Sequence, residues 1–194
     1  ENEMNTEFFG NIDVEQSGDN SDRVGLIEAA DKGTLFFNEI SELPLSFQSK
    51  LLRVIEHRIT RPLGTTQDNK VHARFIASSN RSLRDMAKTG EFRPDLFYRL
   101  NVLTLTLPPL RNRIEDIPLL SNYFLEKTAH RFGRREAKLT TSALDTLEKY
   151  DWPGNVRELR YLLERAALLS NSETIDVLDL GFSEHISKSH EESS

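Results

Sequence analysis

The sequence predicts an α/β fold with a parallel sheet, followed by a small all-α subdomain. Two short runs, residues 35–37 and 75–77, are apolar on both faces, which suits strands buried in a parallel sheet. Residues 102–107 alternate Leu with Thr and stop at Pro108-Pro109, which indicates a third strand. Beyond Leu110 the apolar period changes to 3.6 and no further strong strand is predicted. Strands come first and helices follow, as in a sheet domain with an appended helical part.

Capping residues and apolar periodicity place the helices. Gly10 ends a first short helix, and residues 25–30 form a second. Ser41 as N-cap and Pro44 in the first turn begin a helix that runs to His57. The remaining helices are predicted from the same features at residues 83–88, 94–100, 118–132, 140–150 and 155–170.

We expect three parts in the chain. Residues 1–109 form the α/β subdomain, and residues 110–182 form the helical subdomain, called the lid below. Residues 183–194 are Ser, Glu, His and Lys with one Ile, which predicts a disordered tail or linker. Within the lid, Asn155 and Glu158 have the spacing of a helix N-terminal capping pair.

Composition excludes several classes of protein. A formal net charge of −6 argues against a chain whose main role is to coat nucleic acid. The chain has no cysteine, which excludes disulfides and thiolate metal sites and fits a cytoplasmic location. No apolar run approaches the roughly 20 residues that span a bilayer, so we expect no membrane partner.

Polar residues follow the first buried run at once. Asn38 and Glu39 come directly after residues 35–37. In parallel α/β sheets, ligands bind beyond the carboxyl ends of the strands, which is where these two side chains are expected. The run resembles the second nucleotide motif (Walker B) of P-loop ATPases, which usually ends in Asp-Glu; here the first acid is an amide.

Five strings, in a fixed order, extend this resemblance along the chain. They are EFFG at 7–10, GTLFFNEI at 33–40, FRPDLFYRLNV at 92–102, PPLRNRIEDI at 108–117 and WPGNVREL at 152–159. On these strings the chain resembles the central AAA+ ATPase domain of bacterial enhancer-binding proteins, the sigma-54-dependent transcription activators. The resemblance implies a P-loop AAA+ parallel sheet, incomplete at its N-terminus in this chain, with a helical lid.

The resemblance assigns three catalytic positions beside the sheet. Asn38 takes the place of the acid that holds Mg²⁺, so a weak metal contact through water is implied there. Glu39 takes the place of the glutamate that activates water, and Asn80 that of the polar sensor of the γ-phosphate. The alternative, considered without the family, is that Asn38 is a turn residue and Glu39 an ordinary carboxylate at a helix start.

Three arginines also match family positions. Arg93 and Arg99 match arginine fingers, which a neighbouring subunit inserts to stabilise charge on the transferring phosphoryl group. Arg157 matches the second sensor, and an Arg in the first turn of a helix suits phosphate binding. The alternative for Arg93 and Arg99 is a pair of exposed salt-bridge partners.

The chain departs from the family pattern in three respects. No Gly-x-x-x-x-Gly-Lys-Ser/Thr string occurs, so the phosphate-cradling loop (Walker A) is absent, and relative to the family the sequence is expected to be truncated at its start. Asn38 brings no negative charge, which should weaken both Mg²⁺ binding and hydrolysis. The family's Gly-Ala-Phe-Thr-Gly-Ala loop, which presses on sigma-54 polymerase, corresponds here to the acidic and polar residues 14–19, VEQSGD.

These departures lead to a functional hypothesis with two alternatives. The chain is interpreted as the nucleotide-responsive, oligomerising domain of a bacterial DNA-binding transcription regulator that does not act on sigma-54 polymerase. The first alternative is an ATP-hydrolysing, sigma-54-dependent activator, and the second is a purely architectural oligomerisation domain. Enzymatic activity is left open, because the Walker B acid is replaced and Walker A is absent.

The resemblance also implies ligands and partners. The expected cofactor is ATP or another nucleotide with Mg²⁺, and cyclic di-GMP is a further hypothesis from some relatives. The expected partners are other copies of the chain in a ring or dimer and the RNA polymerase holoenzyme. DNA would be bound through a helix-turn-helix outside this chain.

Overall fold

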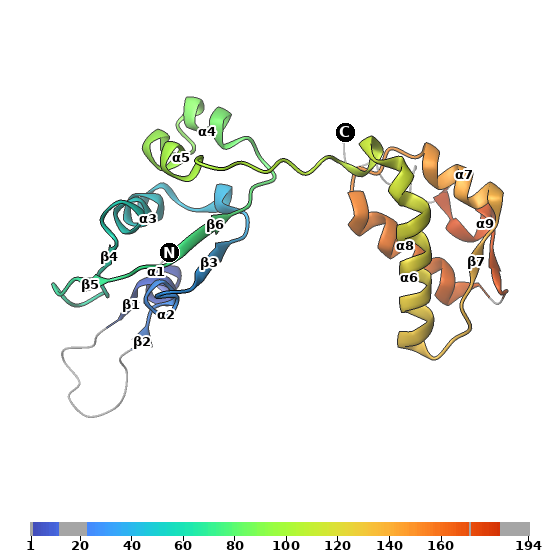
Figure 1. Ribbon diagram of the computed structural model, residues 1–194, viewed down its shortest axis with the longest axis horizontal. Helices are drawn as coiled ribbons and strands as arrows, with labels where there is room; N and C mark the ends of the chain where they lie inside the picture. The colour runs from blue at the N-terminus through green and yellow to red at the C-terminus, as the bar shows by residue number, and fades with distance from the viewer. Residues whose placement is uncertain (1, 12–22, 171, 183–194) are drawn as a thin grey trace. The chain divides into compact units, whose positions relative to one another are not determined.

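The computed structural model describes residues 2–11, 23–170 and 172–182 and divides the chain into two compact units (Figure 1). The first unit is Glu1–Leu105 and the second is Thr106–Ser194. The first holds a parallel strand pair with helices and the second is mainly helical, which confirms the predicted α/β fold with a helical lid. The predicted tail and the predicted loop tip, residues 183–194 and 14–19, lie outside the described residues.

A pair of parallel strands forms the centre of the first unit. Strand β3 (Thr34–Phe37) pairs with β6 (Arg74–Ala77), with Leu35 opposite Phe75. Phe37 is 4% exposed and stacks on Phe8 at a ring-centroid distance of 5.5 Å. Phe37 is therefore part of the core of this unit, and Leu35 and Phe75 on the same face pack against that core while partly buried.

Helices and two small hairpin-like pairs complete the first unit. The helices are α1 (Asn2–Phe9), α2 (Leu26–Ala29), η1 (Ile40–Glu42), α3 (Leu45–His57), α4 (Leu83–Thr89) and α5 (Pro94–Leu100). The antiparallel pairs are β1 (Gly10–Asn11) with β2 (Arg23–Val24) and β4 (Ile59–Thr60) with β5 (Asn69–Lys70). The two pairs are joined by a hydrogen bond from Leu63 N to Gly10 O of 3.0 Å.

Two predictions for the sheet are wrong. Phe36 and Ile76 lie opposite each other and are 56% and 46% exposed, so one face of the β3–β6 pair is not buried. Residues 102–107 do not form a strand, because no strand among the described residues pairs with them. Leu105, predicted to lie in this third strand, is 93% exposed.

The start of α3 also differs from the prediction. Pro44 is the N-cap, and Ser41 lies one turn earlier in η1. The hydroxyl of Ser41 is buried and has no hydrogen-bond partner among the described residues. Ser41 is therefore not the helix cap; the chain makes a separate 3₁₀ turn directly after Glu39 before α3 begins.

The second unit packs its helices around Trp152. Its elements are η2 (Leu110–Asn112), η3 (Ile114–Asp116), α6 (Ile117–Phe132), β7 (Lys138–Leu139), α7 (Thr141–Lys149), α8 (Asn155–Leu169), β8 (Thr174–Ile175) and α9 (Val177–Leu180). Trp152 is fully buried, and its Nε1–H donates to Leu147 O at 2.8 Å. Its ring packs edge-on against Tyr150 with centroids 5.0 Å apart. The short parallel pair β7–β8 was not predicted.

The capping pair predicted for α8 is shifted by one residue. The N-cap is Gly154, whose N–H donates to Glu158 Oε2 at 2.8 Å. Asn155 is instead the first helical residue, and its Oδ1 accepts from Leu110 N at 2.8 Å. Asn155 therefore ties η2 to the start of α8. Across the described part of the chain, every helix is too short or too polar to cross a bilayer.

The two units predict two separable unfolding transitions. Trp152 is the single tryptophan, so its fluorescence reports the second unit alone. Leu147→Ala removes a fully buried side chain there, and we expect the fluorescence-monitored free energy of unfolding to fall by about 2–5 kcal/mol. Leu51→Ala, at an equally buried site of the first unit, should shift the far-UV circular dichroism transition and leave the fluorescence transition in place. Equal shifts of both signals in both variants would contradict two independent units.

Candidate functional site

The carboxyl ends of β3 and β6 bring three of the predicted site residues to one edge. Parallel pairing continues past the strands, because Ser78 N donates to Phe37 O and Ile40 N donates to Ser78 O, both at 2.9 Å. Asn38 and Glu39 follow β3 directly, and Asn80 follows β6 by three residues. The structure therefore gathers two amides and one carboxylate at the edge where parallel sheets bind ligands.

Ser78 connects this group of side chains. Its hydroxyl donates to Asn38 Oδ1 at 2.9 Å and accepts from Glu39 N at 3.2 Å. One side chain directly after β6 thus fixes both residues that follow β3. The sequence indicated Ser78 only as the end of a strand. A hydroxyl residue that directly follows a predicted parallel strand was the feature that could have identified it.

Glu39 adopts an unusual backbone conformation. Its φ of 54° lies in the left-handed region, which costs a residue with a side chain about 1–2 kcal/mol. Its carboxylate is fixed by a hydrogen bond, since Oε2 accepts from Asn80 N at 3.0 Å. Strain of this kind at a half-buried carboxylate occurs often at functional sites, and a carboxylate fixed in this way can orient a water molecule.

The edge fits a metal-bound nucleotide only in part. Asn38 offers a neutral oxygen that already accepts a hydrogen bond from Ser78, and Glu39 is the one carboxylate beside it. In residues 2–11, 23–170 and 172–182, no group of three or more His, Asp or Glu is placed to hold a metal ion. These residues fit Mg²⁺ through an intervening water and through the nucleotide's own phosphates, not a cage of protein carboxylates.

Arg93 is held by groups of its own chain. Its guanidinium forms a two-point ion pair with Asp95, with Nε–Oδ1 and Nη2–Oδ2 distances of 3.0 and 2.7 Å. Nη1 donates to Ser49 Oγ at 3.0 Å. Hydrogen bonding from the Arg93 guanidinium lowers the pKa of the Asp95 carboxyl from its usual value. To reach a phosphate on another subunit, Arg93 would have to leave Asp95.

A buried glutamine positions the backbone before α5. Gln48 is fully buried on α3, and its Oε1 accepts from Arg93 N at 2.8 Å. Its Nε2 donates to Leu43 O at 2.8 Å. Gln48 therefore fixes Arg93 through the main chain while Asp95 fixes the side chain. Nothing in the sequence distinguished Gln48 from an exposed helix residue, since its burial depends on how α3 and α5 pack.

Arg99 and Arg157 are exposed. Arg99 lies in the last turn of α5, and no ion pair with it is present among the described residues. Arg157 lies in the first turn of α8, in the second unit. The structure does not bring Arg93 or Arg99 into a hydrogen bond with Glu39 within the described part of one chain. Their roles as fingers, and that of Arg157 as a sensor, stay predictions.

Comparison with known protein families identifies two matching regions. The Sigma-54 interaction domain matches residues 1–106, and the AAA+ ATPase lid domain matches residues 111–194. The nitric oxide reductase transcription regulator NorR1 of Cupriavidus necator is 45% identical over 175 residues, covering 90% of this chain and 34% of NorR1. The DNA-binding transcriptional activator HyfR of Escherichia coli is 45% identical over 174 residues, covering 90% of this chain and 26% of HyfR. The chain thus spans about a third, or less, of these relatives.

Solved structures give the same match. NtrX of Brucella abortus in complex with ATP superposes with a TM-score of 0.83 at 34% identity, covering 92% of this chain and 41% of NtrX. NtrX in complex with ADP superposes with a TM-score of 0.79 at 35% identity, covering 87% of this chain and 37% of NtrX.

Replacing the buried glutamine should destabilise the first unit. Gln48→Leu leaves the part-buried Arg93 N and Leu43 O without their partner, so we expect the free energy of unfolding to fall by about 2 kcal/mol. Urea titration followed by circular dichroism measures this change. Gln67→Leu makes the same substitution at an exposed residue and should change stability by less than about 0.5 kcal/mol. Equal effects of the two substitutions would contradict the role given to Gln48.

Proposed function

The chain belongs to the Sigma-54 interaction domain family, and from this membership we propose that it is the ATP-hydrolysing, self-assembling domain of a bacterial sigma-54-dependent transcription activator. The observation that carries the proposal is the Glu39 carboxylate, held by Asn80 at the edge of the β3–β6 pair. The names of NorR1 and HyfR and the nucleotide complexes of NtrX support it. They favour this function over the hypothesis that the sequence alone placed first.

In this proposal the residues of the edge act on water and on phosphate. Glu39 orients the attacking water and accepts its proton, and the Asn80 side chain contacts the γ-phosphate. Arg99 of a neighbouring copy stabilises charge on the transferring group, and Arg157 adds a further cation from the lid. Mg²⁺, when bound with the nucleotide, would neutralise phosphate charge beside Asn38.

The proposal extends to partners outside the chain. A finger supplied by a neighbour requires assembly into a ring or dimer. We propose the RNA polymerase holoenzyme as the target and DNA as a ligand of a domain outside this chain, by analogy with the activators that it resembles.

A second candidate is supported by two departures in the sequence. Asn38 stands where the family has an acid, and residues 14–19 carry VEQSGD where activators carry an aromatic loop tip. A regulator of this kind would bind ATP, another nucleotide or cyclic di-GMP as a signal and would control transcription without sigma-54 polymerase. A purely architectural role is the third candidate, and it requires no nucleotide binding at all.

ATP turnover by the intact, assembled protein separates these candidates. We expect turnover, and we expect Glu39→Ala to lower kcat at least about 100-fold because the general base is lost. Glu42→Ala removes an exposed carboxylate three residues away in η1 and serves as the matched control with unchanged kcat. Absence of turnover with nucleotide still bound would favour the sensor, and absence of binding would favour the architectural role.

Restoring the family's acid tests the role of Asn38. Asn38→Asp adds a negative charge beside Glu39. We expect half-maximal turnover at a lower Mg²⁺ concentration and a kcat raised about tenfold or more. The measurement is the Mg²⁺ titration of ATP turnover for both proteins. Asn38→Ala is the companion variant, and it should lower turnover, since it removes the amide oxygen that would hold a metal-bound water. An unchanged Mg²⁺ dependence in Asn38→Asp would show that Asn38 does not limit ATP turnover through metal binding.

A further inference from the structure

A second polar surface lies at the opposite end of the two strands from the Asn38–Glu39 edge. Thr34 and Arg74, the first residues of β3 and β6, line an open hollow of about 560 Å³. Asn38 lies four residues after Thr34 in the sequence, and at a rise of about 3.3 Å per residue this puts the hollow roughly 13 Å from the candidate nucleotide site. The two surfaces are therefore separate sites on one strand pair.

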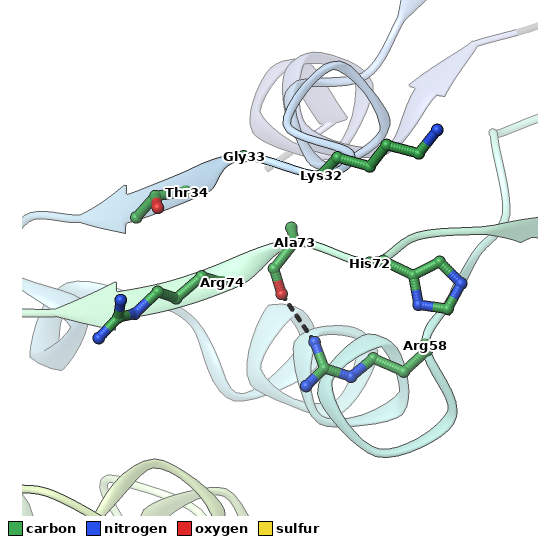
Figure 2. Close-up of a pocket in the computed structure, with 7 residues that line it drawn as sticks. All are labelled: Lys32, Gly33, Thr34, Arg58, His72, Ala73 and Arg74. Atoms are coloured by element: carbon green, nitrogen blue, oxygen red, sulfur yellow. Dashed lines mark hydrogen bonds between the residues drawn. The ribbon is translucent and has the colours of Figure 1, made fainter.

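The hollow is lined by basic side chains, which we call the basic hollow. Figure 2 shows Lys32 in the turn before β3 and Arg58 just after α3, with His72 two residues before β6 and Arg74 at the start of β6. The rest of the lining is small: Gly33, Thr34 and Ala73. The cations come from three segments that are distant in the sequence, so the fold and not a local run of charge collects them.

Arg58 is the fixed cation of this group. Its Nη1 donates to Ala73 O at 2.7 Å, as the dashed line in Figure 2 marks. Its backbone is fixed as well, since Arg58 N donates to Val54 O at 2.9 Å and Arg58 O accepts from Val71 N at 2.8 Å. One bond to a carbonyl uses one of the five guanidinium N–H groups, which leaves donors for a second acceptor.

The cations of the basic hollow lack carboxylate partners. No Asp or Glu lines it, and no ion pair to Lys32, Arg58, His72 or Arg74 is present in the described ranges. The nearest carboxylate in sequence, Asp31, accepts the backbone N–H of His72 at 2.7 Å. In a chain of net charge −6, a hollow whose only charged lining residues are basic is a local exception to the charge balance, with Arg74 on one side of it and Lys32 on the other (Figure 2).

Two of the three lysine and arginine residues of the hollow have a strained backbone conformation. Lys32 has a φ of 60° and Arg58 a φ of 57°, both in the left-handed region. Arg58 is the residue that ends α3, a position where Gly avoids this strain. Left-handed residues other than Gly are held in place by their surroundings and concentrate at ligand clamps. Both strained residues here are basic, and both line the same hollow.

We propose that the basic hollow is a binding site for a phosphate group. Arginine and lysine donors without a paired carboxylate suit phosphate oxygens, which accept two hydrogen bonds from one guanidinium. The lining has no Phe, Tyr or Trp on which a base could stack, so recognition stops at the phosphate and does not read the base. The phosphate belongs either to a nucleic-acid backbone or to a small free polyphosphate.

The test follows the backbone amides of Gly33, Thr34 and Ala73 by NMR in the 194-residue chain. Pyrophosphate and a 20-base-pair duplex of arbitrary sequence are titrated separately. We expect saturable shifts at these amides, distinct from any shift that ATP causes at Glu39. Arg74→Glu should weaken the interaction at least about tenfold, since it replaces a charge-assisted donor by a like charge. Lys149→Glu makes a similar charge reversal at an exposed residue of α7 and should leave the affinity unchanged.

The two sources of phosphate give different results. If the duplex binds more tightly than pyrophosphate, and its affinity falls with salt as expected for three to four phosphate contacts, the ligand is a nucleic-acid backbone. Tighter binding of pyrophosphate assigns a free polyphosphate. The proposal is overturned if no probe shifts these amides, if Lys149→Glu weakens binding as much as Arg74→Glu, or if a polyglutamate peptide binds equally well. Lys32→Glu, in a turn, repeats the test should Arg74→Glu lower the thermal stability of the chain.

Discussion

The parallel pairing of β3 with β6 is the interaction on which the site depends. It buries Phe37 against Phe8 on one side and sets the register that carries Ser78 opposite the end of β3. Both polar surfaces of the first unit follow from this register. Asn38 and Glu39 contact Ser78 at one end, and at the other end Lys32 and Arg74 line the same hollow. A shift of the pairing by one residue would move every side chain of β6 to the other face of the sheet. The residues that now lie together at each end of the strand pair would then be separated.

Ser78 and Gln48 act in the same way at two places. Each is a neutral polar side chain that bonds to main-chain groups of a residue with a candidate chemical role, Ser78 to Glu39 and Gln48 to Arg93. Such residues fix the position of a charged group without altering its charge. The two candidate fingers differ in this respect. Arg93 is held by Asp95, whereas Arg99 projects from the last turn of α5 with no such partner among the described residues.

Local features of the sequence predicted most of the helices, but they predicted less of the strand pairing and of the side-chain burial. The helices ending at Gly10, Gly90 and Gly133 were predicted because a left-handed glycine is a local requirement. The sequence did not predict that one face of β3–β6 is exposed or that residues 102–107 form no strand, since strand formation and burial depend on partners elsewhere in the chain.

The candidate site shows the same division. The positions of Asn38, Glu39 and Asn80 followed from family strings, but the hydrogen bonds of Ser78 required the register of two distant strands. The functional hypothesis shows it too. Asn38 and residues 14–19 favoured a regulator independent of sigma-54, whereas similarity over nine-tenths of the chain favours the activators.

Hydrogen–deuterium exchange of single amides in the 194-residue chain tests the β3–β6 register most directly. The amides of Ile40 and Ser78 donate across the strand pair, and those of Glu39 and Asn80 donate to side chains of the same edge. We expect all four amides to exchange far more slowly than the amide of Leu105, which lies in an exposed segment outside the helices and strands. We further expect Ser78→Ala to speed exchange at Glu39 while Ile40 stays protected. Exchange at Ile40 and Ser78 as fast as at Leu105 would contradict the pairing and, with it, the site.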